Sequence, residues 1–192
     1  MTVEHRPIPP WARRQEVRVG AAIAIAVAIG LVVWLVAIRG GSSSSSSKAP
    51  ASIAPSAASP DRLRELAKQI GHPIYWIGPA ANTTYELTKT PSGRVYVRYL
   101  TNGVAVGSKS PAYTFVGTYP FPDAYTALKA LAKQSTDESF PAPAGGLAVY
   151  AKTTPTNIYV AYPGSNVQIE VYDPSPSHAR SLVREGRVAP VQ

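Results

Sequence analysis

The sequence contains no cysteine, and this absence excludes several kinds of site. Without Cys there is no disulfide scaffold, no thiolate zinc site, no iron–sulfur cluster and no Cys nucleophile. Histidine is also scarce, with 3 residues in a chain of 192, which argues against a metal site built from imidazoles. We therefore expect no metal and no cofactor, and the length allows one ordinary domain with additional segments.

One long hydrophobic run dominates the N-terminal part. Residues 19–38 are 20 uncharged residues between Arg18 and Arg39. As a helix rising about 1.5 Å per residue, the run spans roughly 30 Å, the thickness of a bilayer's hydrocarbon core. A cleaved signal peptide would have a shorter apolar stretch followed by a small-x-small cleavage site, and none follows here. The sequence therefore predicts an uncleaved signal-anchor and a single-pass protein of the cell membrane.

The basic residues around this run predict its orientation. Two basic residues, Arg39 and Lys48, follow the run closely, whereas four precede it: Arg6, Arg13, Arg14 and Arg18. Positive charge collects on the cytoplasmic side, so residues 1–18 are expected in the cytoplasm and residues 39–192 outside it. Small residues recur at every fourth position of the run, which would allow weak homodimerisation through the span, although the alanine-rich composition of the anchor is the simpler explanation.

Residues 39–60 are rich in Ser, Pro and Ala and include six consecutive serines. Such a composition cannot bury a core, so a disordered linker is expected there. The following residues, 61–192, carry 13 basic and 9 acidic side chains, a net charge of +4 out of +8 for the chain. This modest excess gives little support for nucleic-acid binding.

Residues 61–192 are predicted to form one α+β domain with an antiparallel sheet. Apolar periodicity and capping signals indicate three helices, at 61–70, 123–134 and 176–185. Runs of β-branched and aromatic residues indicate seven strands, at 74–77, 84–90, 94–100, 113–118, 147–152, 157–162 and 167–172. Two hairpins can be registered from their turns, pairing Leu87 with Val97, Tyr85 with Tyr99, Glu86 with Arg98, Tyr162 with Val167, Val160 with Ile169, and Ile158 with Val171.

Short matches between the two halves of this domain suggest an internal repeat. The residues around Tyr96–Tyr99 resemble those around Tyr159–Tyr162, and each follows a Lys-Thr pair at the same spacing. We read two β-β-β-α units, with helices on one face of the sheet. That face would bury Val95, Val97, Ile158, Val160, Ile169 and Val171.

No recognised catalytic motif is present, and no catalytic residue is assigned. Glu170, Asp173 and His178 are close in sequence and form the alternative catalytic candidates, as an acid–base cluster of an envelope hydrolase. A solvent-facing strand residue, a turn residue and a helix-start residue explain the same three positions without catalysis.

Tyrosine is the remaining feature, with all 11 residues between Tyr75 and Tyr172. Strand alternation places many of them, with arginines and amides, on the sheet face away from the helices. Such a face suits contact with a sugar, a peptide or a protein, although Tyr also favours strands for packing alone. The ligand-contact candidates are Tyr96, Arg98, Tyr159 and Tyr172.

The segments GHPIYWIG (71–78) and QIEVYDPSP (168–176) resemble parts of uncharacterised bacterial single-pass exported proteins with a small α+β extracytoplasmic domain. The resemblance supports the topology and the extent of the domain, and it brings no activity. The leading hypothesis is a non-enzymatic binding or scaffolding module of the cell envelope, contacting cell-wall polymer or another envelope protein. The alternatives are the envelope hydrolase and a structural subunit of a membrane complex.

Overall fold

The computed structural model describes residues 51–192, and the predicted span at 19–38 lies outside the described residues. Within 51–192, no helix has both the length and the apolar character that a membrane crossing requires. Residues 51–192 belong to one compact unit. Their buried side chains pack against one another in three clusters, so this segment contains a complete core.

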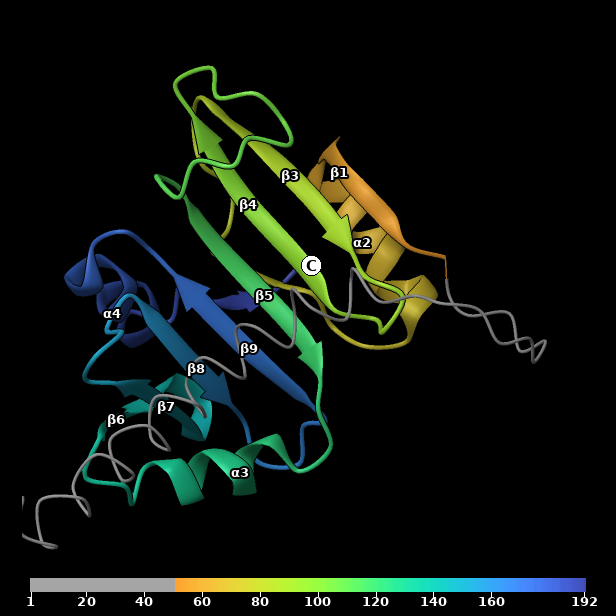
Figure 1. Cartoon of the computed structure of the whole chain (residues 1–192). Helices are drawn as coiled ribbons and strands as arrows, with labels where there is room; N and C mark the ends of the chain where they lie inside the picture. Colours follow the sequence, from red (N-terminus) through yellow and green to blue (C-terminus); the bar gives the residue numbers. More distant parts are fainter. Residues whose placement is uncertain (1–50) are drawn as a thin grey trace, which may run out of the picture. The chain divides into compact units, whose positions relative to one another are not determined.

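The domain is an α+β structure built on one antiparallel sheet of eight strands, in the order β1-β3-β4-β5-β9-β8-β7-β6 (Figure 1). Its strands are β1 (Ile53–Ala58), β3 (Thr83–Lys89), β4 (Val95–Thr101), β5 (Thr114–Pro120), β6 (Asp137–Ala142), β7 (Gly146–Ala151), β8 (Asn157–Ala161) and β9 (Val167–Tyr172). A small second sheet pairs β2 (Tyr75–Trp76) with β10 (Ala189–Pro190). The helices are α2 (Pro60–Ile70), α3 (Ala124–Leu131) and α4 (Pro176–Arg184), with a 3₁₀ turn η2 at Pro143–Gly145.

The three predicted helices and both predicted hairpins are present. Ser59 caps α2 by accepting a hydrogen bond from the Arg62 backbone, and Gly71 ends the helix in the left-handed conformation, with φ at 72°. The ladders pair Leu87 with Val97 and Val160 with Ile169, as the turn lengths predicted. All six residues predicted to be buried in the sheet are fully buried.

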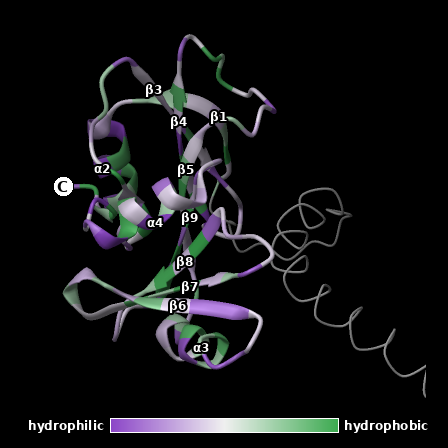
Figure 2. Cartoon of the chain, turned by 90° about the vertical axis from the view of Figure 1, so that its left-hand side faces the viewer, coloured by the Kyte–Doolittle hydropathy of each residue, from purple (hydrophilic) through white to green (hydrophobic). Residues whose placement is uncertain are grey.

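Helices cover both faces of the sheet, and the prediction of a single covered face is wrong for α3. Helices α2 and α4 pack on one face of the sheet (Figure 2). There α4 buries Leu182 and Val183 against Val160 and its neighbours. Helix α3 buries Leu128 against Val149, Ala161 and Tyr159. Because alternate residues of a strand face opposite sides, Val149 and Tyr159 lie on the other face from Val160. The strands that precede α3 and α4 nevertheless form two similar meanders, β3-β4-β5 and β7-β8-β9, joined at β5 and β9.

Strand β1 lies inside the segment expected to be a disordered linker, so the predicted linker end at residue 60 is wrong. β1 pairs with β3, and a bulge between Ile53 and Ser56 accommodates Pro55 at this sheet edge. Ile53 and Ala58 pack against the cluster under α2. The segment therefore gains ladder hydrogen bonds and apolar burial that its composition alone does not suggest.

Candidate functional site

The open part of the sheet face opposite α2 and α4 carries a row of aromatic rings. Ladder pairs place Tyr96 beside Gly117, and Phe115 beside Tyr172. Ring centroids lie 5.5 Å apart between Tyr119 and Tyr96, 6.1 Å between Tyr96 and Phe115, and 5.2 Å between Phe115 and Tyr172. The row continues to Tyr113, 6.5 Å from Tyr172. We call these five residues of β4, β5, β9 and the preceding loop the aromatic strip.

An arginine lies at each end of the aromatic strip. The guanidinium of Arg94 lies 5.8 Å from the ring centre of Tyr119, and that of Arg98 lies 3.7 Å from the ring centre of Tyr113. Arg98 also binds Glu86 at 2.5 Å and donates to the backbone oxygen of Ser108 at 2.7 Å. Its side chain is only 13% exposed. Arg98, predicted to contact ligand, is therefore mainly a structural link between the sheet and the loop at 102–113.

The predicted contact residues do not all lie on the accessible surface. Tyr172 lies on the strip and donates its hydroxyl hydrogen bond to the backbone oxygen of Pro111 at 3.1 Å. The Tyr96 ring lies on the strip too, but its hydroxyl is buried and has no protein partner among the described residues. Tyr159 packs under α3. Burial raises its pKa, and the neighbouring Glu170 carboxyl raises it further.

Glu170 lies beside the strip in a cluster of phenols. Its carboxyl accepts hydrogen bonds from the hydroxyl of Tyr119 and, at 2.6 Å, from the side-chain amide of Asn157. Desolvation raises the pKa of Glu170, while hydrogen bonds from Tyr119, Asn157 and Tyr159 oppose that rise. These hydrogen bonds fix the Glu170 carboxyl group in a desolvated environment. Glycoside hydrolysis uses a pair of carboxyl groups, and Glu170 has no such partner in this network.

Asp173 and His178 lie apart from Glu170. Residues 170 and 173 of the same extended segment face opposite sides, and the Asp173 carboxylate turns toward the N-terminus of α4. Asp173 accepts a hydrogen bond from His178 Nδ1 at 2.8 Å. Both residues line a pocket with Thr114 and Tyr113. The predicted cluster of three is thus a pair, Asp173 and His178, with Glu170 in a separate network.

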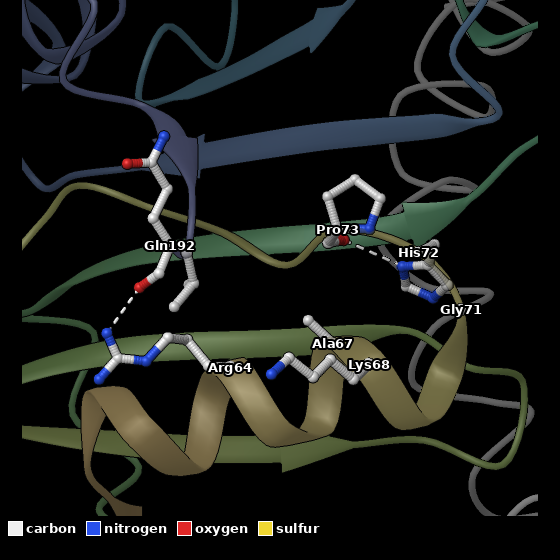
Figure 3. A pocket seen from close by; sticks show the side chains of 8 residues that line it. Arg64, Ala67, Lys68, Gly71, His72, Pro73 and Gln192 are labelled. Carbon is white, nitrogen blue, oxygen red and sulfur yellow. Dashed lines mark hydrogen bonds between the residues drawn. The ribbon is translucent and has the colours of Figure 1, made fainter.

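A second hollow lies between α2 and the C-terminal residues (Figure 3). Its basic side chains are Arg64, Lys68 and His72. Arg64 is already engaged, because it pairs with Asp61 and donates to the backbone oxygen of Gln192 at 2.7 Å. The hollow is therefore a weak candidate for binding an anion.

Within residues 51–192, no group of three or more His, Asp or Glu side chains is placed to hold a metal ion.

Sequence reasoning missed several residues of these sites. Tyr119 lies one residue beyond the predicted end of its strand, so its position beside Glu170 was not anticipated. Phe115 lay inside the predicted strand at 113–118, and strand alternation alone would have placed it on the strip. Asn157 and Thr114 carry no signal in the sequence, because their roles depend on contacts with residues 13 and 59 positions away.

Comparisons with known proteins add no relative: no family model, no curated protein and no solved structure matches the chain.

Proposed function

We propose that this protein is a single-pass membrane protein that displays residues 51–192 outside the cell as a non-enzymatic binding module of the cell envelope. The N-terminus would lie in the cytoplasm and residues 19–38 in the membrane. The aromatic strip would be the contact surface, and its ligand would be cell-wall polymer. The observation that supports the proposal is the continuous row of five aromatic rings on one sheet face, with an arginine at each end. Four of the rings are partly exposed, and the fifth, Tyr119, is buried.

The chemistry of the strip suits a polar polymer. Tyrosine presents an apolar ring and a hydroxyl that forms hydrogen bonds, so it can pack on the apolar face of a sugar and bind its hydroxyls. The rings already pack against one another, Phe115 and Tyr172 stacked and the others tilted or edge to face, which limits the entropy that they lose when a ligand binds.

The rest of the described surface disfavours the structural-subunit alternative. Among residues 51–192, the large hydrophobic side chains that are exposed are Val106 and Phe121, at 37% and 41%. Stable docking to another membrane protein usually needs a contiguous apolar patch. Two separate side chains do not provide one.

Co-sedimentation of residues 48–192 with isolated cell-wall material tests the proposal. We expect binding that persists at high salt, because ring packing is screened far less than the attraction of this fragment, with a net charge of +5, to an acidic polymer. Tyr172→Ala should weaken the binding by about tenfold, the equivalent of roughly 1.4 kcal/mol. Tyr150→Ala is the matched control, since Tyr150 is a partly exposed tyrosine of β7 whose hydroxyl binds Glu138.

Three results would contradict the proposal. Equal loss in the Tyr172 and Tyr150 variants would mean that the strip is not the contact surface. Binding that vanishes at high salt would reduce the interaction to nonspecific charge attraction. No binding at either salt concentration would reject wall polymer and direct the search to a protein partner in the envelope.

A further inference from the structure

A pocket lies at one end of the central strands, next to Tyr113 at the end of the aromatic strip. It has a volume of 370 Å³, within the range of small-molecule sites. Its walls come from the end of β4, the start of β5, the segment before β3 and the first turn of α4. The lining residues are Ile77, Ala80, Thr83, Tyr99, Thr101, Ala112, Tyr113, Thr114, Asp173, Pro174 and His178. We call it the Asp173 pocket.

Asp173 is a preorganised, buried group in the wall of this pocket. The residue is 5% exposed. Its carboxylate accepts hydrogen bonds from Thr114 Oγ1 at 2.5 Å, His178 Nδ1 at 2.8 Å and the Ser175 backbone N–H at 2.8 Å. These bonds hold the carboxylate from β5, from α4 and from the turn before α4. The pocket wall is therefore rigid before any ligand arrives.

This arrangement also orients His178. The bond to Asp173 occupies Nδ1 and leaves Nε2 as the free ring nitrogen. The His178 side chain is 54% exposed, so Nε2 is accessible to a ligand for a hydrogen bond. Thr101 adds a hydroxyl at the exposed rim, with no hydrogen-bond partner in the described part of the chain. Tyr99 contributes only its ring, because its hydroxyl already accepts from Ile77 and donates to Gly78.

The charge of the lining selects the class of ligand. No Lys or Arg lines the pocket, and a buried carboxylate repels anions, so phosphates and carboxylates fit poorly. The Asp173 charge is already offset by three hydrogen bonds, and His178 stands between it and solvent, so an ammonium group gains little. What remains is a combination of hydroxyls, an imidazole and two tyrosine rings, which suits a neutral molecule with many hydroxyls.

We propose that the Asp173 pocket binds one neutral sugar residue, with His178 Nε2 and the Thr101 hydroxyl as hydrogen-bonding groups and the Tyr113 ring as an apolar wall. This second site adjoins the aromatic strip and shares Tyr113 with it, but its polar groups, His178 and Thr101, lie outside the strip, and it does not depend on binding to cell-wall polymer.

NMR titration of residues 48–192 with soluble sugars tests the proposal. The probes are glucose, galactose, arabinose and N-acetylglucosamine, with inorganic phosphate and ethanolamine as charged comparators. We expect at least one sugar to give saturable shifts at the amides of Thr101, Thr114 and His178, and neither charged comparator to do so. Thr101→Val and His178→Gln should each lower the affinity for that sugar by about fivefold, the effect of losing one hydrogen bond. Ser181→Ala is the control, because Ser181 lies on α4 outside the pocket lining and bonds to Glu185.

The outcomes separate clearly. No saturable shift with any of the four sugars overturns the proposal, and so do shifts caused by phosphate or ethanolamine instead. Sugar affinity that is unchanged in both the Thr101 and His178 variants overturns the placement of the site. Amide spectra of the free variants show whether each remains folded. Wall co-sedimentation is measured independently, so its failure leaves the sugar titration to decide this site alone.

Discussion

At the scale of single residues, Gly117 determines how the acidic end of the aromatic strip is built. The residue is buried in β5, and a Cβ atom there would overlap the ring and hydroxyl of Tyr119, two positions along the same strand face. The missing side chain lets the Tyr119 phenol lie back along the strand and reach the Glu170 carboxyl. We expect Gly117→Ala to displace this phenol and lower the free energy of unfolding by about 1–3 kcal/mol, measured by urea denaturation.

A double-mutant cycle isolates this cause. In a Tyr119→Leu background the phenol is absent, so Gly117→Ala should cost clearly less than it does in the wild type. Equal destabilisation in the two backgrounds would show that Gly117 matters for its backbone conformation, and not for the space that it leaves to the Tyr119 ring.

At the scale of elements, the loop at 102–113 is held to the sheet by one buried ion pair. Glu86 is fully buried, accepts from the Gly107 backbone at 2.5 Å, and binds Arg98 at 2.5 Å. Glu86→Gln would leave Arg98 without its charged partner, at a cost of about 3–5 kcal/mol. We expect the amides of residues 102–113 to exchange much faster with deuterium than in the wild type. Glu138→Gln, which alters an exposed carboxyl, should leave their exchange unchanged. Equally fast exchange in both variants would show that the Glu86–Arg98 pair does not hold the loop.

The elements also show how far sequence reasoning extends. Hairpins with a clear turn, such as β3-β4, were predicted to the residue, because one register alone buries all the apolar side chains on one face. Edge strands were missed. β6 begins with two acidic residues and contains Pro141, which are unfavourable in strands but tolerated at an edge where half of the hydrogen bonds face solvent. Its burial of Phe140 depends on α4, a contact that local sequence does not contain.

The same limit applies to the candidate sites. Pairing Glu86 with Arg98 followed from the hairpin register, and that pair is present. Strand alternation alone would have separated Glu170 from Asp173, but the two residues were grouped with His178 because all three are close in sequence. The bond between Thr114 and Asp173 joins two strands whose adjacency, β5 beside β9, no local pattern indicates. Contacts within a hairpin were thus predictable, whereas contacts between meanders were not.

At the scale of the whole molecule, the buried tyrosines should make the domain less stable at alkaline pH. Burial raises the pKa values of Tyr99, Tyr119 and Tyr159 above the ordinary value of 10.0. In the unfolded chain these phenols ionise near pH 10, while in the folded domain they keep their protons. The unfolded state therefore binds fewer protons above pH 10, and stability falls as the pH rises, by about 1.4 kcal/mol per pH unit for each tyrosine. Below pH 10 these groups are protonated in both states and contribute no slope.

Urea unfolding of residues 48–192 at pH 8 to 11.5 measures this dependence. We expect a nearly constant free energy of unfolding up to about pH 9.5, then a steep fall with a slope of at least about three protons. Tyr119→Phe removes one of the three groups and should reduce the slope by about one proton. A slope that is the same in the wild type and in Tyr119→Phe would mean that the Tyr119 phenol is accessible to solvent. In that case the acidic end of the aromatic strip would be open in solution, and Glu170 would join the contact surface.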